Sequence, residues 1–151
     1  MQYLPILLNI SRKKILIVGG GNVAFLKSRN IRRFTSDITF LALDFNEDIH
    51  NPGNTLIMKA YESEDLDLFD IVYACTNNKE LNLKIRNDAN KRGILVSVCD
   101  NPQISDFGST ATCKINNVTI SVGTNGTDVK KSIAIRNKIQ ELIDNNILKI
   151  D

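Results

Sequence analysis

The sequence holds little of several residue types that mark other classes of protein. Among its 151 residues there is no Trp, and there are only three Pro, three Cys and one His. A single histidine cannot build a histidine-based metal cage, and the cysteines lack the C-x-x-C spacing typical of zinc sites. We therefore expect no resident metal, and we interpret His50, which lies in a polar loop, as a surface residue.

Strong charge and long apolar runs are also missing. A net charge of +2 is too small to indicate a nucleic-acid or membrane-surface partner. No apolar stretch is long enough to cross a bilayer, and the first ten residues, interrupted by Pro5, lack the basic start of a secretory signal. We expect a cytoplasmic protein with one main core, in which Cys75, Cys99 and Cys113 remain reduced.

The first two thirds of the chain alternate short apolar runs with longer mixed stretches. The runs predict strands over residues 14–18, 38–43, 55–60, 71–75 and 94–98, and the stretches predict helices over 22–34 and 79–91. Ser63 is a candidate N-cap for one short helical turn, and Gly93 ends the second helix. Nearly all-apolar strands that alternate with helices are typical of a parallel sheet covered on both faces. We predict an α/β fold, a Rossmann-type doubly wound parallel sheet within residues 1–108.

After Pro102 the pattern changes. Alternating residues over 109–115 and 118–122, separated by Asn116 and Asn117, predict a hairpin, and an amphipathic helix is expected to begin near Asp128. We interpret residues 109–151 as a dimerisation segment that pairs with a second copy of the chain. The alternative is a terminal helix that folds back on its own sheet.

A glycine cluster is the most informative stretch of the chain. The apolar residues 15–18 lead directly into residues 19–24 (GGGNVA), which fit the G-x-G-x-x-A pattern of dinucleotide-binding units. Gly19 would form the tight turn after the strand, and Gly21 would let the backbone approach a pyrophosphate. The free N–H groups of the following helix would bind the phosphates. A glycine-rich turn in an unrelated sheet is the alternative.

Polar residues follow three other strands, at the edge where ligands bind in such sheets. Asp44 would take the adenosine ribose hydroxyls and favour NAD over NADP, or it would only begin an acidic loop. Thr76 begins a small polar run that either lies beside the nicotinamide or caps the next helix. Asp100 lies where chemistry is usually done, although Asp-Asn-Pro is also a common turn.

Together these stretches resemble the precorrin-2 dehydrogenase/sirohydrochlorin ferrochelatase family, the amino-terminal module of siroheme synthase. The resemblance runs through nearly the whole chain in order. The matching residues are 4–6, 18–24 with Lys27, 74–78 with Asn82, 98–102, Phe107 and 123–127.

The resemblance implies an NAD-dependent oxidation of the tetrapyrrole precorrin-2 to sirohydrochlorin, with ferrous iron inserted as a further substrate in some members. It also implies a homodimer. It places nucleotide contacts at Asn22, Val23, Leu43 and Asp44, and a catalytic carboxylate at Asp100. The competing hypothesis is a non-catalytic NAD-sensing regulatory module, which would have little use for residues 100–102 and the hairpin after them.

Overall fold

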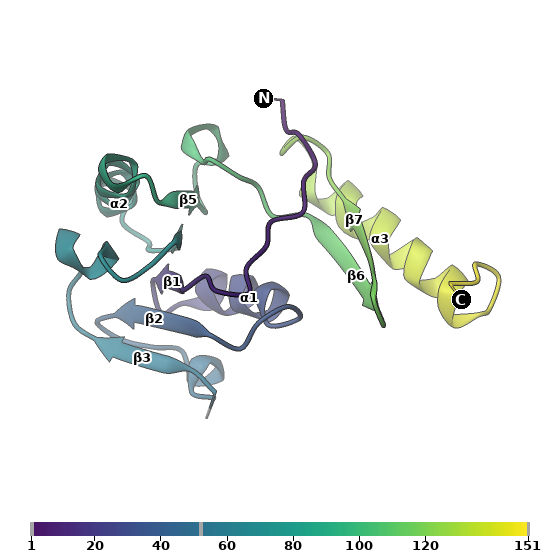
Figure 1. The fold of residues 1–151 in the computed structure, drawn as a ribbon, viewed down its shortest axis with the longest axis horizontal. Helices are drawn as coiled ribbons and strands as arrows, with labels where there is room; N and C mark the ends of the chain where they lie inside the picture. Colours follow the sequence, from purple (N-terminus) through teal and green to yellow (C-terminus); the bar gives the residue numbers. More distant parts are fainter. Residues whose placement is uncertain (1, 52, 151) are drawn as a thin grey trace. The chain divides into compact units, whose positions relative to one another are not determined.

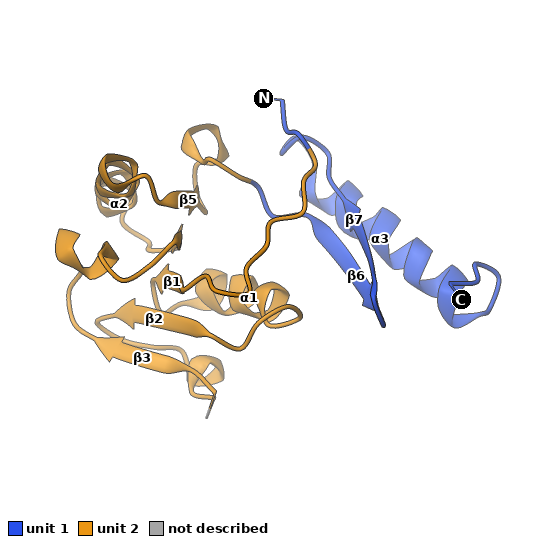
Figure 2. Ribbon diagram, viewed as in Figure 1, with its two compact units in different colours: residues 1–4, 108–151 blue, residues 5–107 orange. Residues whose placement is uncertain are grey.

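The structure is a computed structural model that describes residues 2–51 and 53–150. Its contacts divide the chain into two compact units (Figure 2). One unit comprises residues 5–107, and the other comprises residues 1–4 together with 108–151.

The larger unit contains a five-stranded sheet in which every neighbouring pair of strands is parallel. The strand order is β3-β2-β1-β4-β5 (Figure 1). The strand bounds are β1 (Ile15–Val18), β2 (Ile38–Ala42), β3 (Thr55–Met58), β4 (Ile71–Ala74) and β5 (Leu95–Val98). The chain moves outward from β1 to β3 and then returns to β4 on the other side of β1. The loops after β1 and β4 therefore diverge, which creates the topological switch point at which such sheets bind ligands.

Two helices cover the two faces of this sheet. Leu16 and its neighbours on one face pack with residues of α2 (Lys79–Arg92), among them Ile85. Ile17 and its neighbours on the other face pack with Ala24 of α1 (Asn22–Ile31). Successive strand residues point to opposite faces, so a sheet covered on both sides needs strands that are apolar throughout. The predicted doubly wound α/β fold is confirmed.

Short 3-10 helices connect several of these elements: η1 (Glu47–Ile49), η2 (Ser63–Leu66) and η3 (Pro102–Ile104). The sequence predicted Ser63 as an N-cap, and this prediction is wrong, because Ser63 is the first residue of η2. The cap is Glu62, because its backbone N–H donates to Asp65 Oδ2 at 2.8 Å and so starts the turn one residue earlier.

The ends of the two long helices differ in how well they were predicted. Helix α1 ends at Ile31 and not at Phe34, because Phe34 N and Thr35 N both donate to the Ile31 carbonyl in a turn. Helix α2 ends as expected at Gly93, whose φ of +69° is the left-handed conformation that glycine adopts at low cost.

The smaller unit is a hairpin with one helix. Strands β6 (Ala111–Ile115) and β7 (Val118–Val122) pair antiparallel around a turn in which Asn116 has a φ of +54°. Helix α3 (Val129–Asp144) begins after Asp128, whose carboxylate accepts from Lys131 N at 2.8 Å. It packs against both strands of the hairpin. None of the helices in the described ranges has both the length and the apolar character needed to span a membrane.

Candidate functional site

The turn from β1 to α1 is built on two glycines that have no room for a side chain. Gly19 has a φ of +130°, and a Cβ added to it would collide with the carbonyl oxygen of Cys75. A Cβ on Gly20 would collide with the carbonyl oxygen of Asp44. The tight turn expected at Gly19 is therefore present. The sequence pattern treats Gly20 as a free position, and its contact with Asp44 follows only from the pairing of β1 with β2.

Gly21 has the opposite surroundings. It is the N-cap of α1, and a Cβ on it would meet no heavy atom within 4 Å. No side chain caps this end of α1, so the N–H groups of its first turn remain available to an anion. An uncapped helix start with open space at Gly21 fits the pyrophosphate of a dinucleotide.

The end of β2 lies beside this turn. Asp44 is exposed, and its Oδ1 accepts from Phe45 N at 2.8 Å. Asn46 holds the two segments together, because its backbone N–H donates to the Gly20 carbonyl at 2.7 Å and its side-chain amide donates to Asn22 Oδ1. No motif in the sequence pointed to this role of Asn46. The exposed Leu43 and Val23 lie at the same end of the sheet, at 72% and 46% exposure.

A second group of polar side chains joins the ends of β4 and β5. Asn82, on α2, donates from Nδ2 to Asp100 Oδ1 at 2.9 Å and to the Thr76 carbonyl at 3.0 Å. Its Oδ1 accepts from Thr76 Oγ1 at 2.7 Å and from Thr76 N at 3.2 Å. Asn82 is 1% exposed, whereas Asp100 is open to solvent. The structure therefore links two of the predicted site residues through a third whose role the sequence did not reveal.

The alternative roles considered for the segments after β4 and β5, a helix cap and a turn, are taken by residues next to Thr76 and Asp100. Asn78 caps α2, since its Oδ1 accepts from Glu80 N at 2.9 Å and Leu81 N at 3.1 Å. Asn101 caps η3 by accepting from Gln103 N at 3.3 Å. Capping and site formation thus use different side chains of the same segments.

The prediction for two of the three cysteines is wrong. Cys75 and Cys99 are not separate reduced thiols but form a disulfide, with their Cα atoms 5.2 Å apart. They follow β4 and β5, which are neighbours in the sheet, and the sequence alone does not give that strand order. Cys113 is a buried free cysteine, as expected. The disulfide joins the same strand ends that carry Thr76 and Asp100.

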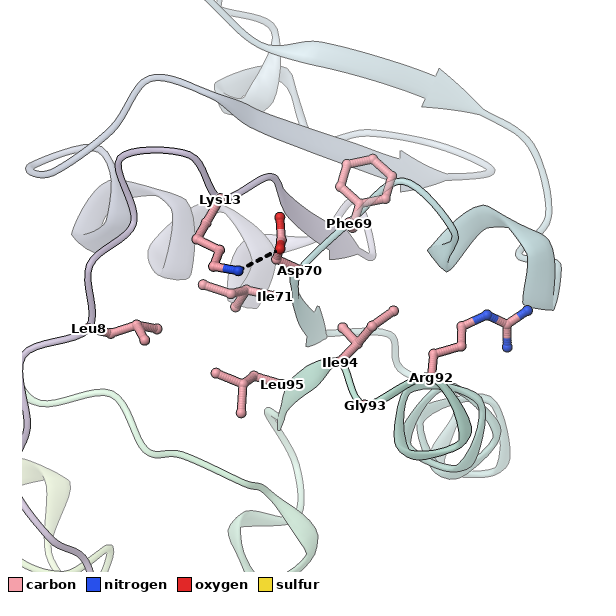
Figure 3. A pocket seen from close by; sticks show the side chains of 9 residues that line it. All are labelled: Leu8, Lys13, Phe69, Asp70, Ile71, Arg92, Gly93, Ile94 and Leu95. Carbon is pink, nitrogen blue, oxygen red and sulfur yellow. Dashed lines mark hydrogen bonds and ion pairs between the residues drawn. The ribbon is translucent and has the colours of Figure 1, made fainter.

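A hollow of about 270 Å³ lies at the opposite edge of this sheet, where β4 and β5 begin (Figure 3). Its lining includes Lys13, Asp70 and Arg92, together with apolar side chains. Lys13 pairs with Asp70 at 2.8 Å, and Arg92 pairs with Asp67 at 2.8 Å. The hydrogen bond from Lys13, with a second from the Lys14 backbone, holds the pKa of Asp70 below its ordinary value. These charges are directed at protein partners, so the hollow does not resemble a ligand site.

His50 is exposed and forms a T-shaped pair with the Phe45 ring, with the ring centroids 6.2 Å apart. Across residues 2–51 and 53–150, no group of three or more His, Cys, Asp or Glu side chains is placed to hold a metal ion.

A glycine turn at the start of an uncapped helix, an acid after the second strand and a strand-order reversal between β1 and β4 together define a Rossmann-type dinucleotide-binding protein. A family model described as "Putative NAD(P)-binding" matches residues 6–111. The chain belongs to this NAD(P)-binding family.

Similar proteins come from siroheme biosynthesis. The chain is 29% identical over 148 residues to a siroheme synthase of Nitrosomonas europaea, covering 95% of this chain and 31% of that protein. It is 28% identical over 151 residues to a siroheme synthase of Photobacterium profundum, covering 97% of this chain and 32% of that protein. The chain thus spans about a third of the length of these curated relatives.

A solved structure titled "SirC, precorrin-2 dehydrogenase" has the same fold. Its TM-score is 0.77 at 20% sequence identity, and the match covers 96% of this chain and 73% of that one. The resemblance described from the sequence is confirmed by these relatives.

Proposed function

We propose that the chain oxidises precorrin-2 to sirohydrochlorin with NAD. The observation that carries this proposal is the Asp100 carboxylate, exposed at the carboxyl edge of the sheet and hydrogen-bonded to buried Asn82. The names of the similar proteins, siroheme synthase and precorrin-2 dehydrogenase, supply the substrate class.

The residues at the first and second strand ends suit the cofactor. Gly19 and Gly21 would admit the pyrophosphate, with the N–H groups of Asn22 and Val23 at the start of α1. Leu43 and Asp44 would contact the adenosine end, where a carboxylate favours NAD over NADP. Thr76 would lie at the nicotinamide end. When bound, NAD supplies the acceptor for a hydride.

Asp100 would act as the general base. Removal of a hydride takes two electrons and one proton from the macrocycle, and a second proton must also leave to give the neutral product. A carboxylate within hydrogen-bond reach of that proton accepts it and later releases it to water. The same group would accept pyrrole protons if ferrous iron is inserted, an activity we propose as secondary.

The test measures NADH absorbance after purified protein is mixed with precorrin-2 and NAD. We expect turnover, and we expect Asp100→Ala to lower kcat by about 10²- to 10⁴-fold, the usual contribution of a general base. The NAD dissociation constant should remain unchanged. Asp37→Ala is the matched control, because Asp37 is exposed just before β2, at the other edge of the sheet.

Two results would contradict the proposal. NAD binding without any turnover would favour the NAD-sensing regulatory module. Turnover that survives Asp100→Ala would leave the dehydrogenase but remove Asp100 as its base.

The assembly and location are further parts of the proposal. We assign residues 1–108 to NAD binding and residues 109–151 to a homodimer interface, in a cytoplasmic protein. Apolar residues left exposed on α3, namely Val129 at 68% and Ile133 at 42%, support an interface there. Sedimentation of the purified chain tests the dimer.

A further inference from the structure

Asn82 has a position that helix packing alone does not explain. It lies in the first turns of α2, is 1% exposed, and directs its polar amide toward the ends of β4 and β5. We propose that Asn82 is a positioning residue that fixes the orientation of the Asp100 carboxylate. This inference rests on the proposed role of Asp100.

The amide of Asn82 has one orientation in which all of its hydrogen bonds are made. A carboxamide offers two acceptor lone pairs and two donor hydrogens. Here both acceptor sites are used by Thr76, through its N–H and its hydroxyl, and the donors go to the Thr76 carbonyl and to Asp100. A flipped amide would set its oxygen against the Thr76 carbonyl and the Asp100 carboxylate. The backbone of Thr76 therefore fixes the plane of the amide, and with it the direction of the bond to Asp100.

A neutral donor is suited to holding a base. An exposed aspartate samples several rotamers, and a fixed N–H restricts the carboxylate to those that keep the hydrogen bond. A lysine or arginine in the same place would also hold the carboxylate, but its positive charge would favour the ionised form and compete with the proton to be accepted. Asn82 orients the oxygen atoms without adding a charge.

A double-mutant cycle separates positioning from simple support of the fold. The kcat for NADH formation is measured at saturating NAD for the unmodified protein, Asn82→Ala, Asp100→Ala and the double variant. We expect Asn82→Ala alone to lower kcat by about 10- to 100-fold, the scale of a misplaced catalytic group. With Asp100 already removed, the same change should cause no further loss.

Two additional variants guard against a folding defect. Asn82→Asp keeps the shape and the acceptors for Thr76 but loses both donors, the one to Asp100 and the one to the Thr76 carbonyl, and sets a second carboxylate against Asp100, so it should lower kcat at least as much as Asn82→Ala. Asn78→Ala removes the cap of the same helix end, at a cost of about 1 kcal/mol, without touching Asp100. It should leave kcat within about two-fold.

A readout on the ligand-free protein follows the bond itself. The side-chain ¹⁵N amide signal of Asn82 should move, and its hydrogen exchange should become faster, in Asp100→Ala but not in Asn78→Ala. This holds whatever the protein does with precorrin-2, so it is independent of the proposed function.

Several outcomes would overturn the inference. Equal losses from Asn82→Ala with and without Asp100 would make Asn82 merely structural. A change in the NAD dissociation constant at unchanged kcat would mean that it acts through Thr76 on the cofactor. An unchanged Asn82 amide signal in Asp100→Ala would show that the hydrogen bond between Asn82 and Asp100 does not form in solution. A kcat unaffected by Asp100→Ala would reject the proposed base, and the inference with it.

Discussion

The two edges of the five-stranded sheet carry similar residue types but arrange them differently. At the amino edge, where β4 and β5 begin, the charged groups around the hollow have protein partners, since Lys13 pairs with Asp70 and Arg92 pairs with Asp67. At the carboxyl edge, where the strands end, Asp100 is held by a neutral amide, and no side chain caps the start of α1 beside the open space at Gly21. This hollow therefore lies at the end of the sheet whose charged groups already have protein partners. The candidate site is therefore distinguished by polar groups that remain open to a ligand, and a hollow alone does not mark it.

The largest expected effect is on stability and concerns the disulfide, which joins strand ends at the carboxyl edge and not at the amino edge. Reduction of Cys75–Cys99 should lower the free energy of unfolding by about 3.5 kcal/mol, because the unfolded chain regains the entropy of the closed loop. Denaturant titrations with and without reductant measure this.

Thiol counting provides the control. The denatured protein should have one reactive thiol before reduction, that of Cys113, and three after it. Three reactive thiols before reduction would mean that Cys75 and Cys99 are reduced, as the sequence predicted.

A somewhat smaller effect is expected within the glycine turn. Gly20→Ala should cost about 3 kcal/mol of stability, because the new methyl group collides with the backbone of Asp44. Its matched variant is Gly21→Ala, where the methyl group meets nothing within 4 Å. That change should leave stability within about 0.5 kcal/mol but weaken NAD binding, since the methyl group would occupy the open space at the start of α1.

Thermal unfolding and NAD titration of both variants distinguish the two effects. If Gly21→Ala bound NAD as tightly as the unmodified protein, the pyrophosphate would have to lie elsewhere.

The smallest effect is expected at the amino edge. The pKa of Asp70 is lowered in the folded protein, so its contribution to stability is present above its ordinary value of 3.8 and is lost as the pH falls below that value. Because both side chains of the pair are more than a third exposed, Asp70→Asn should cost about 0.5 kcal/mol at neutral pH. The difference from the unmodified protein should shrink in acid.

The activity of the Asp70→Asn variant tests whether the amino edge takes part in function. Asp70→Asn should not alter kcat or NAD binding, since Asp70 lies before β4 and the proposed site lies after it. A large loss of activity would mean that the amino edge takes part in function.

Local signals were enough to predict most elements of the fold. Apolar runs predicted the five strands of the sheet, and alternating residues predicted the two strands of the hairpin, which are the strands of the described residues; Gly93 and Asp128 marked a helix end and a helix start. The end of α1 was predicted too late, because residues 32–34 continue the pattern of the helix while forming a turn.

The missed features of the site depend on neighbours that are distant in the chain. The Cys75–Cys99 bond requires that β4 and β5 be adjacent, and the need for glycine at position 20 requires that β2 lie beside β1. The role of Asn82 requires knowing which side of α2 faces the strand ends. A pattern in one sequence indicates residue types and spacing, and these contacts follow only from the assembled sheet.

The close approach of Gly19 to Cys75 has a consequence for how the protein would respond to its ligand. In the proposed site, residues 19–46 would form one half of the nucleotide crevice and residues 75–100 the other, and Gly19 lies against the Cys75 carbonyl where the two would meet. A partly folded chain with only one half in place would lack a complete crevice. Dinucleotide would therefore bind only chains whose halves have joined, and its presence would draw the population of molecules toward the completed domain.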